Sequence, residues 1–501
     1  MNVRETKKQG GNPMAENILK IRDDNCVVLE RSGDGFEIRE GKSLSWLASG
    51  NTPSKIDLSS LRSGIEPWLT SLFQSEHLSL LVGTGLSYSL SKLATKSNMN
   101  AESGATVSET SGETSTDCKK TLMDIPALTS EKYRELVLAS VKDIAEKGRR
   151  GNANIEDTIR VINELLRGLE ILGHSKIEEK PTSEQIAFTE LKNNLEKIIV
   201  DFTKSISDIE RSIAIAEPSK RVEAFSYLVN FLMSFASRSG TRDRLNIFTT
   251  NYDRVIEAGA ELAGLHLLDR FTGTLAPIFR SSRLDTDMHY NPPGIRGEPR
   301  YLEGVARFTK LHGSIDWIYT GEDIRIIGLP FGSEDIRSFL NAPGLNDIDS
   351  RKVMIYPNSA KDRETAEYPY VELFRDFAAA LCRPNSTLVT YGYGFGDEHI
   401  NRVIKDMLTI PSTHLVVISY NDAGGRIMKK YEEMGRHSQI TLIMGEDLAE
   451  IKTLVDYFMP KPSIDKASIR MSELIKQRYS SIQKGEFPEE NFPTKMGGAE
   501  T

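Results

Sequence analysis

The stretch NIFTTNYDRVIEAG, residues 246–259, contains the features that decide the fold. An apolar start runs into two threonines, an asparagine and an aspartate, and a helical pattern follows. This order predicts a buried strand, a polar turn and a helix. One interpretation of the turn is capping, in which Asn251 or Asp253 accepts hydrogen bonds from the first free N–H groups of the helix. The other interpretation is a binding pocket at the end of the strand.

Three more apolar segments end in a polar or glycine-rich turn that precedes a helical pattern. They are LSLLV at 78–82, TLVTY at 387–391 and HLVVISY at 414–420. Strands that alternate with helices predict right-handed crossovers and a largely parallel sheet. The expected fold class is therefore α/β, a Rossmann-like three-layer α/β/α parallel sheet with a helical insertion. Because ligands collect at the carboxyl ends of such strands, we expect the four turns to share one edge of the sheet.

The 501 residues are enough for one large domain with insertions or for two or three domains. We expect a mixed N-terminal segment at 1–60, a main α/β domain at 61–460, and a C-terminal helix with a polar tail at 461–501. Residues 95–117 are rich in Ser, Thr, Gly and Glu, and they have too few apolar side chains to offset the entropy of ordering. This composition predicts a flexible loop. Amphipathic helices at about 120–240 form the predicted insertion.

The composition is that of a globular protein that needs neither a membrane nor nucleic acid. Hydrophobic residues make up 39% and charged residues 27% of the chain, which suits a sizeable core. The net charge of −8 argues against general electrostatic binding to nucleic acid. No apolar run approaches the ~20 residues that span a bilayer, and the first residues contain no apolar signal-peptide region. We therefore expect a cytoplasmic protein.

The cysteines and most histidines carry no recognisable site. Cys26, Cys118 and Cys382 lie far apart, form no Cys-x-x-Cys pair and are too few for a four-thiolate zinc site. We expect free thiols and no metal. His289 and His399 are among the histidines to which the sequence assigns no role.

Three further turns carry residues suited to chemistry, and each also has a purely structural interpretation. Gly83 and Gly85 follow a strand directly, where glycine lets a diphosphate approach the N–H groups of a helix start, but a plain turn explains them equally well. His312 is either a structural histidine or a base near neutral pH. YGYGFGDEHIN, at 391–401, either lines a nucleotide or forms a tight turn with Asp397 as the helix cap.

Taken in order, these turns resemble those of the sirtuin-like family. The order is Gly-x-Gly-x-Ser, Thr-Asn-Tyr-Asp, Leu-His-Gly and Gly-Tyr-Gly-Phe-Gly-Asp, between about residues 76 and 425 outside the helical insertion. The most specific elements are the turn from Thr250 to Asp253 and the pair His312-Gly313, and the glycine turns support them. The chain is most similar to the bacterial branch whose members hydrolyse NAD and act in defence against phage.

The resemblance implies roles for particular residues of this chain. Asn251 matches the asparagine that places the ribose and the attacking water, and His312 matches the histidine that contacts the ribose hydroxyls and acts as the base. Thr84 stands where alanine is usual, and Gly394 replaces a hydroxyl residue. The resemblance implies that the turn at Gly83–Ser87 holds the diphosphate and that the turn at Asn251–Asp253 places the nicotinamide ribose. It also implies that the turns after the last two strands line the adenine ribose. The residues assigned to NAD binding are Gly83, Thr84, Gly85, Ser87, Thr250, Asp253, Gly392, Gly394 and Asn421.

The implied activity is NAD glycohydrolysis, with NAD as the substrate and with nicotinamide and ADP-ribose as products. Nicotinamide leaves as a neutral base, so the protein has to orient the ribose and supply a water, and no metal is needed. A protein deacylase or ADP-ribosyltransferase is an alternative, although sirtuin deacylases usually carry two Cys-x-x-Cys pairs that this chain lacks. A non-catalytic sensor of NAD or ADP-ribose is another.

The resemblance also implies a cellular setting. Relatives in this branch often form homo-oligomers, and some work with a HerA-type hexameric ATPase. An unregulated NAD hydrolase would deplete its own cell, so we expect a low resting activity that a phage-derived activator or a partner raises.

Overall fold

The fold is described from a computed structural model of the chain. The described residues are 16–22, 25–39, 44–46, 56–95, 131–147, 155–173, 182–236, 243–282, 287–290, 300–320, 323–333 and 368–461. The predicted loop at 95–117 lies outside these ranges from residue 96 onward, and so does the predicted C-terminal helix from residue 462 onward. The sheet and its helices belong to a compact unit that ends at Met459, and Pro460–Thr501 form a second unit.

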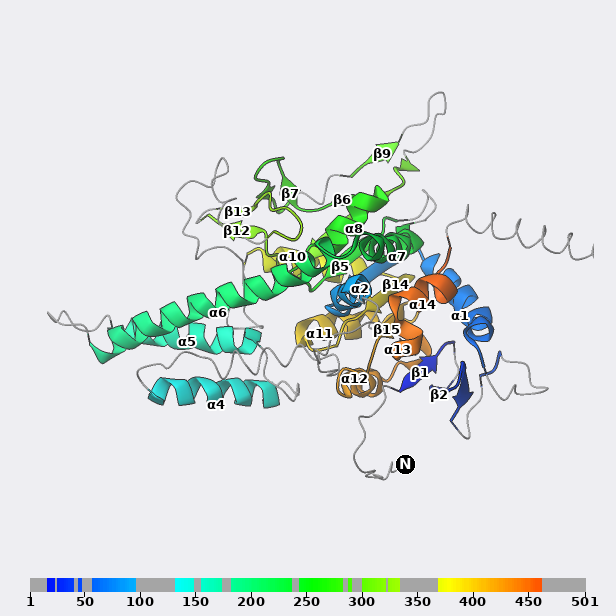
Figure 1. Cartoon of the computed structure of the whole chain (residues 1–501), viewed down its shortest axis with the longest axis horizontal. Helices are drawn as coiled ribbons and strands as arrows, with labels where there is room; N and C mark the ends of the chain where they lie inside the picture. The colour runs from blue at the N-terminus through cyan, green and yellow to red at the C-terminus, as the bar shows by residue number, and fades with distance from the viewer. Residues whose placement is uncertain are drawn as a thin grey trace, which may run out of the picture. The chain divides into compact units, whose positions relative to one another are not determined.

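A largely parallel sheet forms the centre of the first unit, as the sequence predicts. Its parallel strands lie in the order β16, β15, β14, β4, β5, β11, β6 (Figure 1). All six neighbouring pairs in this series are parallel. The strands are β4 (His77–Val82), β5 (Asn246–Thr249), β6 (His266–Leu268), β11 (Val305–Lys310), β14 (Ser386–Tyr391), β15 (His414–Ser419) and β16 (Ile440–Met444). The α/β fold class is confirmed.

Three N-terminal strands extend this sheet beyond β16. They are β1 (Asn17–Lys20), β2 (Val27–Ser32) and β3 (Gly35–Ile38), and each pairs antiparallel with its neighbour. The buried Lys20 ammonium donates hydrogen bonds to the carbonyl oxygens of Arg22 at 2.8 Å and Ile440 at 2.7 Å, which fixes β1 beside β16. Residues 17–38 of the predicted N-terminal segment thus contribute three strands to the main sheet.

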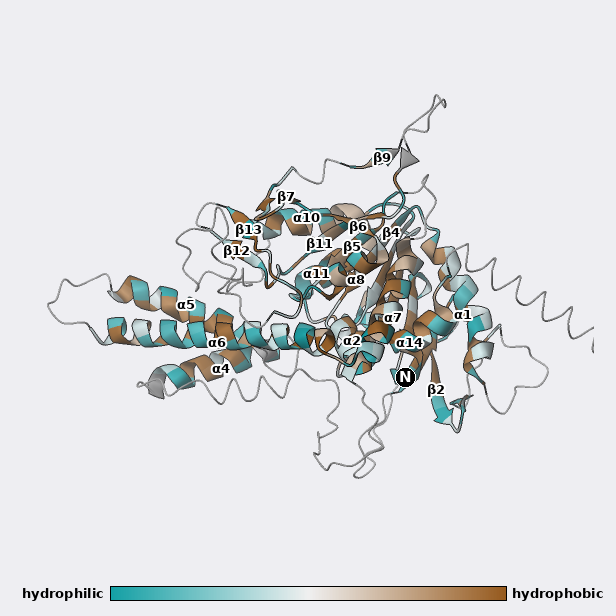
Figure 2. Cartoon of the chain, turned by 45° about the horizontal axis from the view of Figure 1, so that its top comes forward, coloured by the Kyte–Doolittle hydropathy of each residue, from teal (hydrophilic) through white to brown (hydrophobic). Residues whose placement is uncertain are grey.

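Helices cover both faces of the sheet because its strands are apolar on both sides. In β15, Val416 and Ile418 belong to one core, and Leu415 and Val417 belong to the other. Figure 2 shows these central strands largely in the hydrophobic colour. One face is covered by α1 (Leu58–Phe73), α2 (Gly85–Thr95), α7 (Pro218–Ala236), α8 (Val255–Ala263), α13 (Glu446–Ala449) and α14 (Ile451–Thr453), followed by a π-helix at Leu454–Phe458. The other face is covered by α10 (Tyr370–Leu381), α11 (Glu398–Met407) and α12 (Arg426–Met434).

The helical insertion has a core of its own. It contains α4 (Glu131–Lys147), α5 (Ile155–Gly173) and α6 (Ser183–Ala214), whose apolar stripes meet at residues such as Val141, Ile162 and Leu191. Helix α6 begins with a capping box, in which the Thr182 hydroxyl accepts the N–H of Gln185 and the Gln185 side chain accepts the N–H of Thr182. It then runs on from this bundle to α2, as Figure 1 shows.

Small sheets stand beside the main one. Strands β7 (Phe271–Thr272), β8 (Ile278–Phe279), β12 (Trp317–Tyr319) and β13 (Ile324–Ile326) form a four-stranded sheet, and β9 (His289–Tyr290) pairs with β10 (Arg300–Tyr301). A short 3₁₀-helix, His437–Gln439, precedes β16. Among the described helices, none combines the length and the apolar character that a membrane span requires.

Candidate functional site

The turns that the sequence singles out meet at one edge of the sheet. Val82 of β4 lies opposite Thr249 of β5, and Thr249 lies opposite Lys310 of β11. Asn251 and His312 each follow these paired residues by two positions, so they leave neighbouring strands at the same level. Neighbouring strands lie about 4.8 Å apart. The expectation that the polar turns share an edge is confirmed.

The side chain of Asn251 is buried and is held by two hydrogen bonds from its Nδ2. This nitrogen donates to the carbonyl oxygen of Gly83 at 3.0 Å and to Ser87 Oγ at 3.1 Å. The Gly83 oxygen can only accept, which fixes the orientation of the amide. At its other end, Oδ1 is buried and has no hydrogen-bond partner. Such an acceptor costs about 1–3 kcal/mol, which a ligand hydroxyl or a water would relieve.

Asp253 joins the turn after β5 to α2 and to α8. Its Oδ2 accepts the Ser87 hydroxyl at 2.7 Å, and its Oδ1 accepts the N–H of Val255 at 3.1 Å. The capping interpretation therefore holds for Asp253 and not for Asn251, whose amide binds the turn after β4. Burial raises the pKa of the Asp253 carboxyl, while the Lys310 ammonium and the Ser87 hydroxyl act in the opposite direction.

Three glycines bring the turns after β4 and β14 into backbone contact. A Cβ on Gly85 would lie 2.6 Å from the Cα of Gly392, and a Cβ on Gly83 would lie 2.4 Å from the Gly392 carbonyl oxygen. The N–H of Gly85 donates to that oxygen at 3.2 Å. Close backbone packing is a sufficient reason for these glycines, so their contact with a diphosphate stays a prediction. Thr84, between them, is exposed.

Substituting Gly392 by alanine is expected to destabilise the fold by about 2–4 kcal/mol. Its φ is +62°, and the new Cβ would meet the backbone of Gly85 at 2.6 Å. Gly394→Ala is the matched control, because its Cβ would first meet the Arg426 side chain at 3.3 Å and its φ is not positive. Urea denaturation measures both. Equal stability of the two variants would show that the glycine contact does not hold the turns together.

His312 is buried at the end of β11 beside the Asn251 turn. Its ring centroid lies 6.3 Å from that of Tyr252 and 6.0 Å from that of His399. The N–H of Ile315 donates to the Tyr252 carbonyl oxygen at 3.0 Å, which ties the turn after β11 to the turn after β5. The structure therefore places His312 next to the turn that carries Asn251, and the catalytic roles of both stay predictions.

Two residues at the start of α11 approach His312, and one of them receives no role from the sequence. Asp397 is the N-cap residue of α11, as the sequence predicts, although its side chain makes no capping hydrogen bond there. The ligand atoms of His312, Asp397 and His399 all lie within 4.8 Å of one another. Divalent transition metals accept two imidazoles and a carboxylate, so among the described residues this group could hold a metal ion. An Asp-x-His pair at the carboxyl edge is the signal that the sequence offers.

The remaining predicted residues lie further along the same edge. The carbonyl oxygen of Gly394 accepts Arg426 Nε at 3.1 Å. Asn421 follows β15, and its Oδ1 accepts the N–H of Ala423 at 2.9 Å in a local turn. The N–H of Thr250 donates to the last carbonyl of β4 at 3.1 Å. Strands β14 and β4 separate Asn421 from the strand that carries the Asn251 turn, so its role toward the ribose stays a prediction.

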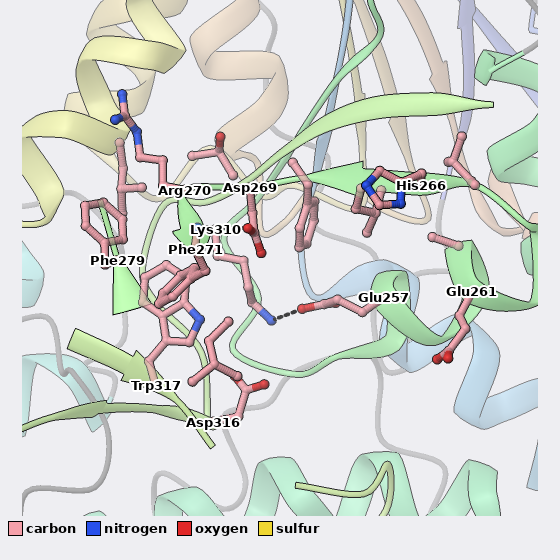
Figure 3. Close-up of a pocket in the computed structure, with 17 residues that line it drawn as sticks. Glu257, Glu261, His266, Asp269, Arg270, Phe271, Phe279, Lys310, Asp316 and Trp317 are labelled. Carbon is pink, nitrogen blue, oxygen red and sulfur yellow. Dashed lines mark hydrogen bonds and ion pairs between the residues drawn. The ribbon is translucent and has the colours of Figure 1, made fainter. Parts of the chain in front are cut away.

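Lys310 is a buried cation beside the turn after β5, and the sequence assigns no role to it. Its Nζ donates to the carbonyl oxygens of Tyr252, at 3.5 Å, and Asp253, and to Glu257 Oε1 at 2.8 Å (Figure 3). Burial raises the pKa of Glu257 to about 7; the charge of Asp316 also raises it, whereas Lys310 lowers it. A lysine at the end of a buried strand is the sequence signal for this network.

Glu257 is expected to make the folded chain less stable as the pH rises from about 4.5 to about 7. The folded state keeps this proton up to a higher pH than the unfolded state, in which the carboxyl has its ordinary pKa of 4.5. It therefore binds more protons in this window and loses stability as they dissociate. Glu257→Gln should lack this slope in urea denaturation at several pH values, and Glu261→Gln, an exposed neighbour on α8, should retain it. Equal slopes in wild type and Glu257→Gln would contradict the assignment.

A buried ion pair connects the helical insertion to the candidate turn. Arg254 Nη2 lies 2.6 Å from Glu210 Oε2, and these side chains are 9% and 0% exposed. Glu210 also accepts the backbone N–H groups of Arg254 at 2.7 Å and Gly332 at 3.2 Å. The pair thus fixes the residue that follows Asp253. Sequence reasoning missed it because nothing in the local pattern relates α6 to the start of α8.

Comparison with known families supports NAD-related chemistry at this edge. Residues 245–440 match the family model of the SIR2-like domain. The matched range includes Asn251, Asp253 and His312, and the hydrogen bonds of Asn251 connect it to the preceding turn at Gly83–Ser87. No curated protein matches the chain. Over residues 245–440 the chain is thus similar to a domain of the kind that uses NAD.

Proposed function

We propose that the chain is an NAD glycohydrolase, which releases nicotinamide from NAD and leaves ADP-ribose. The observation that carries the proposal is the buried amide of Asn251, whose Oδ1 has no hydrogen-bond partner. Asn251 lies within the range that matches the SIR2-like domain, in the turn after β5. The neighbouring strand β11 leads to His312.

The residues at this edge suit the ribose of NAD. Asn251 Nδ2 is occupied by Gly83 and Ser87, so the free acceptor Oδ1 is presented in one orientation. A ribose hydroxyl or a water would donate to it. Ser87, which accepts a hydrogen bond from the Asn251 amide, is itself held in place because its hydroxyl donates to the Asp253 carboxylate. A positioned acceptor of this kind lowers the barrier because its orientation is set before the reaction.

The reaction follows from these two side chains. The bond between C1′ of the ribose and the pyridinium nitrogen breaks, and its electron pair goes to nicotinamide, which leaves as a neutral molecule. A water oriented by Asn251 forms the new bond to C1′. Its proton passes to His312, either directly or through a ribose hydroxyl, and then to solvent. Positive charge develops on the ribose in the transition state, as in other glycoside hydrolyses.

Product analysis tests the proposal. The purified chain is incubated with NAD, with and without an acetyl-lysine peptide, and the products are separated by chromatography. We expect nicotinamide and ADP-ribose in equal amounts without the peptide. Nicotinamide only in the presence of the peptide would indicate a deacylase, and ADP-ribose attached to protein would indicate a transferase. Bound but intact NAD would indicate a sensor. Each of these three results would contradict glycohydrolysis.

We also propose that the activity serves defence against phage and that it is low at rest. A homo-oligomer, a HerA-type hexameric ATPase and a phage-derived activator are the proposed regulators. The support is chemical, because unrestrained cleavage of NAD would deplete the host cell. NAD levels in cells that express the chain, measured before and after phage infection, test this part. Full-rate NAD consumption by the purified chain together with harmless expression would contradict it.

A further inference from the structure

A cavity of about 320 Å³ lies next to Lys310, bordered by α8, β6, β11 and the small four-stranded sheet (Figure 3). Its lining includes none of the residues that the sequence assigns to NAD. The volume is at the lower end of the range for small-molecule sites, about 300–1,000 Å³. A ligand of this cavity would therefore be small.

Two buried carboxylates in the lining each have an oxygen without a hydrogen-bond partner. Lys310 Nζ binds Glu257 Oε1, while Glu257 Oε2 and Asp316 Oδ1 are buried and have no hydrogen-bond partner. Asp316 is only 9% exposed. Figure 3 shows Glu257 joined to Lys310 on one side of the cavity and Asp316 next to Trp317. Since a buried acceptor without a partner is costly, these two carboxylate oxygens favour a ligand that carries hydrogen-bond donors.

The other buried cation of the lining, Arg270, is paired with carboxylates, although its Nη1 is buried without a hydrogen-bond partner. Arg270 binds Asp376 of α10 through both Nε and Nη2, at 2.6 Å each, and a second carboxylate, that of Glu372, lies 3.9 Å away. It therefore contributes no excess positive charge to the Glu257 end.

Aromatic rings line the side of the cavity away from Glu257 (Figure 3). The ring centroid of Phe271 lies 4.9 Å from that of Trp317 and 5.4 Å from that of Phe279, and all three residues line the cavity. Aromatic faces attract cations within about 6 Å of the ring centre and stack on planar groups. Carboxylates together with aromatic rings suit a cation that carries a flat apolar part.

We propose that this cavity binds a small organic cation with an N–H donor, such as a primary arylalkylamine. The ammonium group donates to Glu257 Oε2 and Asp316 Oδ1, and the apolar part packs on Phe271, Phe279 and Trp317. The inference does not depend on NAD cleavage, because no residue of the proposed reaction contacts the ligand.

Calorimetric titration of the full chain tests the proposal, with benzylamine as the probe and benzyl alcohol as its neutral counterpart. The titration is run at about pH 8, above the pKa of about 7 to which burial raises the Glu257 carboxyl, so that this carboxyl is ionised. We expect saturable binding of benzylamine, at least about tenfold tighter than that of benzyl alcohol, because a charged donor forms the stronger hydrogen bonds.

Variants decide where the probe binds. Glu257→Gln and Asp316→Asn should each weaken benzylamine binding about tenfold or more. Glu30→Gln should leave it unchanged, because this exposed carboxylate on β2 is not part of the lining of the cavity. Thermal melts confirm that each variant is folded. The proposal is overturned if folded wild type shows no saturable binding of benzylamine, if the alcohol binds as well as the amine, or if both variants keep the wild-type affinity.

Discussion

Replacing His312 with alanine is expected to lower the rate of nicotinamide release from NAD by about 100- to 10,000-fold, the usual contribution of a general base. The imidazole lies at the end of β11, at the same level as Asn251 on β5, so it can take the proton of a water or ribose hydroxyl held there. Nicotinamide is measured by chromatography at saturating NAD. Far-UV circular dichroism shows whether the fold is intact.

His437→Ala is the matched control for this experiment. His437 lies in the 3₁₀-helix before β16, at the amino edge of the sheet, and its side chain is 45% exposed. We expect wild-type turnover from this variant. Unchanged turnover in folded His312→Ala, or an equal loss in both variants, would remove His312 from the reaction.

Asn251→Ala is expected to lower the rate of nicotinamide release by about 100- to 1,000-fold. The loss of one positioned hydrogen-bonding group has an effect of this size in other enzymes. Ser87→Ala keeps the amide but removes the hydroxyl that accepts from Nδ2, so it should lose less. Equal losses would mean that the hydroxyl, and not the amide, carries the effect.

Replacing Glu210 with alanine is expected to lower the free energy of unfolding by about 3–5 kcal/mol, the cost of leaving a buried charge without its partner. Arg254 would lose its ion pair at 2.6 Å, and the backbone N–H groups of Arg254 and Gly332 would lose their acceptor. Urea denaturation measures the change. Because Arg254 follows Asp253 directly, NAD cleavage should also fall.

An exposed ion pair provides the control. Arg31 lies 2.8 Å from Asp447, but its side chain is 66% exposed, so Arg31→Ala should cost no more than about 1 kcal/mol. A double-mutant cycle with Glu210→Leu and Arg254→Met isolates the coupling of the buried pair. A loss below about 1 kcal/mol in Glu210→Ala would show that the pair does not hold the candidate turn.

The sequence predicted the fold best where the buried strands contain no Asp, Glu, Lys or Arg. Strands β4, β14 and β15 are apolar on both faces and were all foreseen, together with β5. Strand β11 was missed because Arg307 and Lys310 interrupt its apolar run. Their charges are tolerated only through distant partners, Asp287 for Arg307 and Glu257 for Lys310. No local pattern contains that information.

The candidate site was predictable as a set of turns but not as a set of contacts. The residue types identified Asn251 and Asp253 as polar groups at a strand end, yet they could not show that only Asp253 caps the helix. The glycine pattern suggested phosphate binding, whereas the structure shows Gly83 and Gly85 packed on Gly392. The Arg254–Glu210 pair depends on the path of α6, which is a tertiary property.

A structure of the His312→Ala chain with bound NAD tests the central claim most directly. We predict that the nicotinamide ribose lies between Asn251 and position 312, with a hydroxyl or a water about 2.7–3.2 Å from Asn251 Oδ1. The diphosphate would lie toward the turn at Gly83–Ser87. NAD bound instead in the cavity beside Trp317, or with its nicotinamide ribose away from Asn251, would contradict the account.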